Sequence, residues 1–188
     1  MRVSRKQAKR VARTETARAA AVKASAKSGV RRADAGRTRL NDFWAEALVV
    51  CPRCSGPAWS RRLDPAATDW TAARRLVCGR CAYTAEWEKK SGAVAAAGID
   101  PYFRRPVWLS TPCCGEMLWA YNPAHLDFLA AFVGARIRER RRDPVHGWSN
   151  AAIASRLPAW LKVAKNRAAI LKGVERLRRR VAEAIERA

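Results

Sequence analysis

Two similar stretches decide the fold of this chain: Leu48-Val49-Val50-Cys51-Pro52-Arg53-Cys54 and Arg75-Leu76-Val77-Cys78-Gly79-Arg80-Cys81. In each, an apolar run typical of a β-strand leads into a Cys-x-x-Cys pair, and 23 residues separate the two pairs. Each pair forms a tight turn that directs two sulfurs to one point. Two such turns on a small antiparallel sheet can therefore surround a single ion tetrahedrally. The spacing predicts a zinc ribbon whose metal ligands are Cys51, Cys54, Cys78 and Cys81.

The predicted metal is one structural Zn²⁺. Thiolates are soft ligands that suit zinc, and four of them leave no open coordination position for catalysis. The ion would also contribute folding free energy that a small core supplies poorly. Two disulfides or a redox-active dithiol are the alternatives. Disulfides require an oxidising compartment, and no export signal is recognisable in the sequence, so we expect a cytoplasmic protein.

The rest of the chain adds strands and helices. Three more strands are expected at residues 83–87, 107–109 and 117–121, the last two joined by a Cys-Gly turn. Asn122-Pro123 is typical of a helix start, and the apolar stripe that follows predicts a helix over about 125–142. A helix or helix pair, bent at Pro158, is expected from about residue 150 onward. Its apolar stripe is expected to be Trp160, Ala164, Leu171, Val174, Leu177, Val181 and Ile185.

These elements predict an α+β fold, a small zinc-ribbon antiparallel sheet followed by two or three helices, with a basic N-terminal arm. We divide the chain accordingly into three regions. Residues 1–42 form a basic arm that is flexible or helical, residues 43–121 the zinc ribbon with its extended antiparallel strands, and residues 122–188 the basic C-terminal helices.

A second cysteine pair, Cys113 and Cys114, lies in the predicted Cys-Gly turn. Adjacent side chains of a strand point to opposite faces, so two neighbouring cysteines are poorly placed to hold one ion. We therefore expect them to be small packed residues. The alternatives are a second metal site completed by His125 and His146, and nucleophilic catalysis by Cys114 with His125.

The chain is strongly basic: 38 Lys and Arg against 16 Asp and Glu give 188 residues a net charge of +22. A charge of this size repels itself unless a polyanion is the usual neighbour. The first 39 residues alone carry 13 basic and 2 acidic residues. This arm is interpreted as a phosphate-binding segment; a solubility tail and a transit peptide are the alternatives. No apolar run reaches the roughly 18 residues of a membrane span, so no membrane insertion is expected.

The candidate phosphate-binding side chains come from the arm, the loop between the cysteine pairs, the end of the predicted 125–142 helix and the C-terminal helix. They are Arg5, Lys6, Lys9, Arg10, Arg13, Arg61, Arg62, Arg138, Arg140, Arg141, Arg142, Lys172, Arg176, Arg179 and Arg180.

Common enzyme signatures are not found in the sequence: there is no Walker A loop, no dinucleotide fingerprint and no His-Glu-x-x-His, and it holds only two histidines. We therefore expect a non-enzymatic protein that binds DNA or RNA, in the cytoplasm and associated there with the nucleoid or the ribosome. The alternative is a zinc-stabilised adaptor that binds another protein without direct nucleic-acid contact. Such an adaptor would bind nucleic acid weakly and with little dependence on salt.

Four segments carry a family resemblance: CPRCSGPAW from residue 51, VCGRCAYTAEW from residue 77, LWAYNPAHL from residue 118 and SRLPAWLKVAKNR from residue 155. Over about residues 45–178 the chain resembles small bacterial proteins described as transcription-factor-IIB-type zinc-ribbon-containing proteins. The resemblance places the four paired cysteines at the ribbon ligand positions and implies no particular activity. Many ribbons have Gly directly after the second Cys of each pair, where this chain has Ser55 and Ala82.

Overall fold

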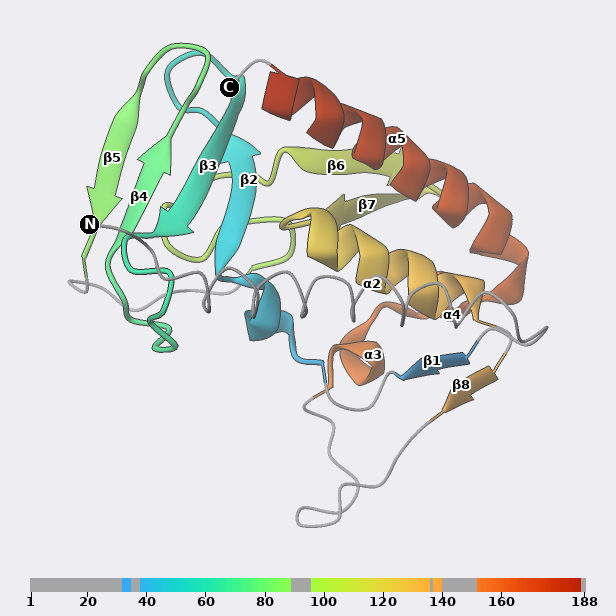
Figure 1. The fold of residues 1–188 in the computed structure, drawn as a ribbon. Helices are drawn as coiled ribbons and strands as arrows, with labels where there is room; N and C mark the ends of the chain where they lie inside the picture. The colour runs from blue at the N-terminus through green and yellow to red at the C-terminus, as the bar shows by residue number, and fades with distance from the viewer. Residues whose placement is uncertain (1–31, 35–37, 89–95, 136, 140–151, 187–188) are drawn as a thin grey trace, which may run out of the picture.

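The computed structural model describes residues 32–34, 38–88, 96–135, 137–139 and 152–186. The fold is α+β, as the sequence predicted: an antiparallel sheet stands beside a separate hairpin, and two long helices pack across that hairpin (Figure 1). The main sheet has the order β2-β3-β4-β5 and every neighbouring pair in it is antiparallel. Its strands are Glu46–Val50, Pro57–Arg62, Arg74–Val77 and Thr84–Trp87.

Strands β3 and β4 alternate between the two faces of this sheet, as the two-residue period of a strand requires. Ala58, Ser60 and Leu76 are buried on the inner face, whereas Arg61 and Arg75 are exposed on the outer face. Arg61 and Arg75 lie opposite each other in the strand register. The inner face therefore contributes to the core, and the outer face presents charged side chains.

The predicted Cys-Gly turn is present. It joins β6 (Leu109–Cys113) to β7 (Glu116–Ala120). The two turn residues, Cys114 and Gly115, have positive φ angles of 56° and 80°. Two consecutive positive φ values belong to the turn type that matches the twist of a two-residue hairpin.

Backbone hydrogen bonds connect this hairpin region to the edge of β2 that does not pair with β3. The Leu48 N–H donates to the Tyr121 carbonyl at 2.7 Å, and the Trp108 N–H donates to the Leu48 carbonyl at 2.8 Å. Leu48 itself is completely buried. The edge of the main sheet is therefore covered by the chain that precedes β6 and follows β7, which removes it as a site for strand addition.

Helix α2 (Pro123–Gly134) begins as predicted but ends earlier than predicted. Asn122 is the N-cap, its side-chain oxygen accepting the His125 N–H at 2.9 Å. The prediction of a helix to about residue 142 is wrong, because a short strand, β8 (Ile137–Glu139), follows and pairs in parallel with β1 (Arg32–Asp34). A tertiary pairing has overridden the helix propensity of the Arg-rich sequence.

The C-terminal region is a series of helices rather than one. Helix α3 (Ile153–Arg156) and helix α4 (Ala159–Lys162) are separated at Pro158, which confirms the predicted bend. A 3₁₀ turn, η3 (Ala164–Asn166), then leads into the long helix α5 (Arg167–Glu186). A second 3₁₀ turn, η2 (Leu40–Phe43), precedes β2. The buried stripe of α5 is Ile170, Val174, Leu177, Val181 and Ala184.

Two members of the predicted stripe lie before α5: Trp160 is partly buried in α4, and Ala164 is exposed in η3. Within α5 the stripe differs from the predicted one at both ends. Leu171 is only partly buried and Ile185 is 59% exposed, while their neighbours Ile170 and Ala184 are buried. Moving one residue along a helix rotates the side chain by about 100°, so these neighbours face different surroundings. Which of two adjacent apolar residues faced inward was decided by the packing partner and not by the local pattern.

A single hydrophobic core joins the sheet, the hairpin and the helices. Helix α5 packs on both α2 and β6 (Figure 1). Its close approach to the hairpin depends on Gly173, because a Cβ there would come within 2.8 Å of the Leu118 Cδ2 atom. Among the described residues, no helix is long and apolar enough to cross a membrane.

Candidate metal centre

The two Cys-x-x-Cys turns lie at the same end of the main sheet. Cys51 and Cys54 occupy the turn between β2 and β3, and Cys78 and Cys81 occupy the turn between β4 and β5. Because all four strands are antiparallel neighbours, both hairpin turns emerge side by side. Backbone bonds close each turn, including the Cys51 N–H to the Gly56 carbonyl at 2.8 Å and the Cys78 N–H to the Tyr83 carbonyl at 2.9 Å.

The four sulfur atoms form a compact cluster. The Cys51 and Cys81 sulfurs are 3.7 Å apart, the Cys54 and Cys78 sulfurs are 3.6 Å apart, and all four lie within 4.8 Å of one another. A tetrahedral ion with metal–sulfur bonds of about 2.3 Å places its sulfurs about 3.8 Å apart. All four cysteines are free thiols, and a disulfide would need sulfurs about 2.05 Å apart. The cluster therefore has the dimensions of a four-thiolate site for one metal ion.

The electrostatics of the cluster depend on the backbone around it. Burial raises the pKa of Cys51, but the N–H groups of Cys54 and Arg53 point at its sulfur and lower the pKa to about 7. Burial, together with the neighbouring thiols, raises the pKa of Cys81 to about 12. Four thiols this close cannot all ionise unless a cation balances their charge. A bound divalent ion would stabilise the fully ionised form that metal ligation requires.

Ser55 and Ala82, which directly follow the second cysteine of each turn, adopt left-handed backbone conformations. Their φ angles are 55° and 53°. This conformation favours glycine because it brings the Cβ of other residues close to the following carbonyl oxygen. Glycine, which has no Cβ, adopts this conformation without that cost. The chain tolerates strain at both positions.

We expect glycine at these positions to stabilise the protein. The left-handed conformation costs about 1–2 kcal/mol for a residue with a Cβ. Glycine avoids this cost, but it lowers the free energy of unfolding by about 0.4–1 kcal/mol because it raises the conformational entropy of the unfolded chain. Ser55→Gly and Ala82→Gly should therefore each raise the free energy of unfolding by about 0.5–1 kcal/mol, measured by denaturant titration. Ala169→Gly, at an exposed position of α5, is the control and should lower it by about 1 kcal/mol. Equal destabilisation by Ala82→Gly and Ala169→Gly would contradict the argument.

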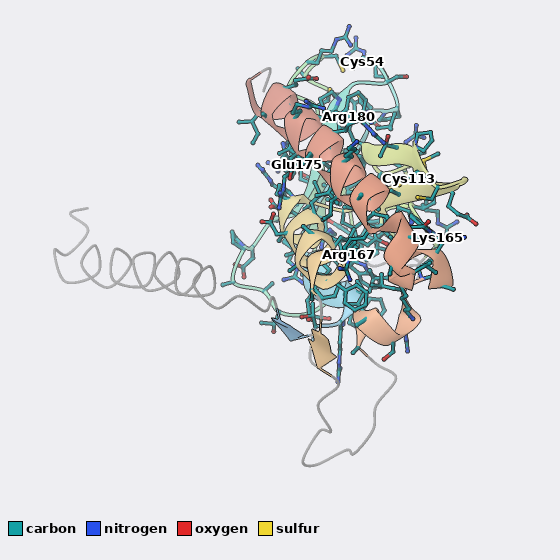
Figure 2. The ribbon with its side chains drawn as sticks, turned by 90° about the vertical axis from the view of Figure 1, so that its right-hand side faces the viewer. Cys54, Cys113, Lys165, Arg167, Glu175 and Arg180 are labelled. Atoms are coloured by element: carbon teal, nitrogen blue, oxygen red, sulfur yellow. The ribbon has the colours of Figure 1, made fainter. Side chains whose placement is uncertain are left out.

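The second cysteine pair lies outside this cluster. Cys113 is buried under α5, away from Cys54 (Figure 2), as expected for a packed small residue, whereas Cys114 is exposed in the turn. The expectation that the two sulfurs point apart was wrong: they are 3.6 Å apart. The left-handed conformation of Cys114 turns its side chain back toward Cys113.

No second metal site accompanies this pair in the described part of the chain, where the four-cysteine cluster is the one group of three or more possible ligands. His125 is instead a core residue with 2% of its surface exposed, its ring stacked on Phe43 at 4.5 Å. Burial lowers the pKa of His125 to about 4, so it is neutral at physiological pH. His146 lies outside the described residues.

The candidate phosphate-binding side chains fall into three groups. Arg61 forms an ion pair with Glu46 at 3.2 Å on the outer face of the sheet and lies over the ring of Trp59 at 4.3 Å. Arg62 donates to the Ala67 carbonyl at 2.6 Å. These two side chains are therefore held by contacts within the sheet and the loop that follows β3. A further group of candidates lies outside the described residues, apart from the backbone of Arg138. Its other members are Arg5, Lys6, Lys9, Arg10, Arg13, Arg140, Arg141 and Arg142.

The α5 candidates form the second group, and they differ in their contacts. Arg180 donates to the Ser110 carbonyl at 2.8 Å and lies over the ring of Trp108 at 4.6 Å. Arg176 donates to the Pro112 carbonyl at 3.2 Å. Both side chains thus hold α5 against β6. Lys172 and Arg179 are exposed and make no hydrogen bond or ion pair with any described residue.

Sequence reasoning missed one buried cation, Arg74. Its side chain is completely buried on the inner face of the sheet, where it donates to the carbonyls of Trp44 and Ala45 and lies 3.9 Å from the ring centre of Tyr102. The alternation of a strand was the available signal: with Arg74 and Arg75 adjacent in β4, one of them must face inward. Arg74 therefore ties β4 to the chain before β2 and is not available to a partner.

Searches against protein-family models, curated proteins and solved structures found no match to this chain.

Proposed function

We propose that this chain is a non-enzymatic, structural zinc protein that binds nucleic acid. The observation that carries the proposal is the four-sulfur cluster within a chain of net charge +22. The cluster offers a closed coordination sphere, so the ion would hold the sheet together and would not bind a substrate. Soft thiolate ligands in a tetrahedral arrangement suit zinc, and an iron ion is the competing occupant. Metal analysis of the purified protein distinguishes the two.

The described cations support a polyanion as the partner. Helix α5 carries six basic residues on its twenty, and its C-terminal end lies at the same end of the molecule as the cysteine cluster (Figures 1 and 2). Arg178 is neutralised locally by Asp127 at 2.6 Å and Glu175 at 2.5 Å. Lys172 and Arg179 are exposed and have no such carboxylate. These two are the α5 cations best placed to neutralise phosphates.

Binding should depend steeply on salt. Each neutralised phosphate releases counterions, so the dissociation constant of a complex with about four contacts should rise about a hundredfold between 50 and 200 mM salt. Fluorescence anisotropy with labelled single-stranded RNA and double-stranded DNA of equal length measures this and separates the two partners. A dissociation constant that does not change with salt would contradict the proposal and favour a protein-binding adaptor.

The double variant Lys172→Ala/Arg179→Ala should weaken binding about tenfold at 100 mM salt and reduce the slope of the salt dependence by about 2. Its thermal stability should be unchanged, because neither side chain has a described partner. The matched control is Arg178→Ala, which removes a guanidinium already paired with Asp127 and Glu175. Arg178→Ala should therefore change the affinity much less. The double variant removes two charges and the control removes one. A loss of binding free energy from Arg178→Ala half as large as that from the double variant would therefore show that net charge matters and this face of α5 does not.

A further inference from the structure

A mostly apolar hollow of about 200 Å³ lies between β7, the first half of α2 and the α3–α4 segment. Its walls include Leu118 and Trp119 from β7, Leu129 from α2, and Leu157 and Trp160 from the C-terminal series. Apart from the indole N–H groups of Trp119 and Trp160, His125 and Arg156 contribute the polar side chains of the lining. The hollow thus combines aromatic and aliphatic walls with few polar groups, the usual character of a small-molecule site.

His125 supplies this hollow with one hydrogen-bond donor. Its Nδ1 atom accepts the Tyr121 N–H at 3.4 Å, so the proton of the neutral ring is on Nε2. The ring is held in place by stacking on Phe43, with 7° between the two planes. No described residue accepts a hydrogen bond from Nε2. His125 is only 2% exposed, yet Nε2 is not among the buried side-chain atoms that lack a partner, so this donor is open to the hollow, where an acceptor on a ligand can replace water.

The size of the hollow limits what that acceptor can belong to. A dry apolar cavity of about 150 Å³ in another protein holds benzene, so about 200 Å³ fits one or two fused rings. Arg156 is exposed, so its guanidinium is solvated, and the enclosed part of the hollow offers a ligand apolar walls and the donor of His125. Further polar groups on the enclosed part of a ligand would lose their hydrogen bonds to water. That part of the ligand should therefore carry one acceptor and no charge.

We propose that this hollow binds a small, neutral, planar aromatic molecule of one or two rings, whose single hydrogen-bond acceptor takes the Nε2–H of His125. The rings pack between Trp119 and the aliphatic walls. This site is separate from the four-cysteine cluster and does not rest on nucleic-acid binding.

A second, more open hollow of about 410 Å³ adjoins the first and provides a route to it. The two share Ala97, Met117, Trp119, Pro158 and Trp160 as walls. Met117 is 52% exposed, and methionine adapts readily to different ligands. The shared rim is therefore the entrance through which a ligand reaches His125.

Isoquinoline and naphthalene test the proposal as a matched pair, because they have the same shape and only isoquinoline carries a ring-nitrogen acceptor. Both should bind the zinc-loaded full chain saturably in ligand-observed NMR titrations. One hydrogen bond contributes about 1–1.5 kcal/mol, or about tenfold in affinity. In His125→Phe, which keeps an aromatic ring on Phe43, the ratio of isoquinoline to naphthalene affinity should therefore fall about tenfold. The difference in hydrophobicity between the two ligands is the same for both proteins, so a change in this affinity ratio reports the hydrogen bond.

A second variant shows where the ligands bind. Ala97 is exposed and lines both hollows, so Ala97→Phe should place a ring in the entrance and abolish binding of both ligands. Its thermal unfolding and metal content should match those of the unmodified protein. The proposal is wrong if neither ligand binds the unmodified protein, if Ala97→Phe leaves binding intact, or if His125→Phe leaves the affinity ratio unchanged. Should His125→Phe not fold, Ala97→Phe and the unmodified protein still decide the matter.

Discussion

Cys78→Ser should abolish tight metal binding and unfold the main sheet. Cys78 is completely buried, and its sulfur lies 3.6 Å from that of Cys54 within the cluster. Structural zinc contributes about 10–16 kcal/mol to zinc-dependent folds, as much as the whole stability of a small domain, about 5–15 kcal/mol. We expect one zinc ion per unmodified chain and none in the variant. Metal analysis and the loss of strand signal in circular dichroism measure both effects.

Cys114→Ser is the control for this experiment. Cys114 is exposed and its neighbour in space is Cys113, outside the metal cluster. This variant should keep one zinc ion and the melting temperature of the unmodified protein, because an exposed substitution usually changes stability by less than about 0.5 kcal/mol. A Cys78→Ser protein that kept both its zinc and its melting temperature would rule out the four-sulfur site. A chelator should reproduce the effect of Cys78→Ser on the unmodified protein.

Asn122→Ala should cost about 3 kcal/mol, a large loss for the removal of one polar side chain. Asn122 is 4% exposed and makes three hydrogen bonds of 2.9 Å. Its oxygen accepts the His125 N–H and caps α2, and its amide group donates to the carbonyls of Phe43 and Glu46. Loss of an N-cap costs about 0.5–2 kcal/mol, and each buried carbonyl left without a donor costs about 1–3 kcal/mol. The costs of the lost N-cap and of the two unpaired carbonyls arise from one side chain, so they do not simply add.

The same substitution at Asn166 provides the comparison. Asn166 is partly buried and its amide group donates a single hydrogen bond, to the Trp160 carbonyl at 2.9 Å. Asn166→Ala should therefore cost about 1 kcal/mol, within the usual range for one hydrogen bond. Denaturant titration of the two variants measures the difference. If Asn122→Ala lost no more stability than Asn166→Ala, Asn122 would not join the sheet to α2 as described.

The accuracy of the sequence predictions depended on the range of the interactions involved. The Asn122 cap and the Cys114-Gly115 turn were predicted well, because capping and turn preferences involve only neighbouring residues. The end of α2 was not predicted correctly. The chain leaves the helix at Gly134 and forms β8, which pairs with β1, a strand about a hundred residues earlier in the sequence. The partners of Arg176 and Arg180 were equally out of reach, since both contact β6.

The sequence by itself determined where a metal ion can bind, because two Cys-x-x-Cys turns carry their own geometry and need only a sheet to bring them together. It also determined the basic character of the chain and the start of α2. Only the tertiary structure decided that Arg74 is buried, that Arg178 is neutralised, and that His125 lines an apolar hollow. Each of these depends on side chains from distant parts of the chain meeting in the core, and local patterns carry no information about such contacts.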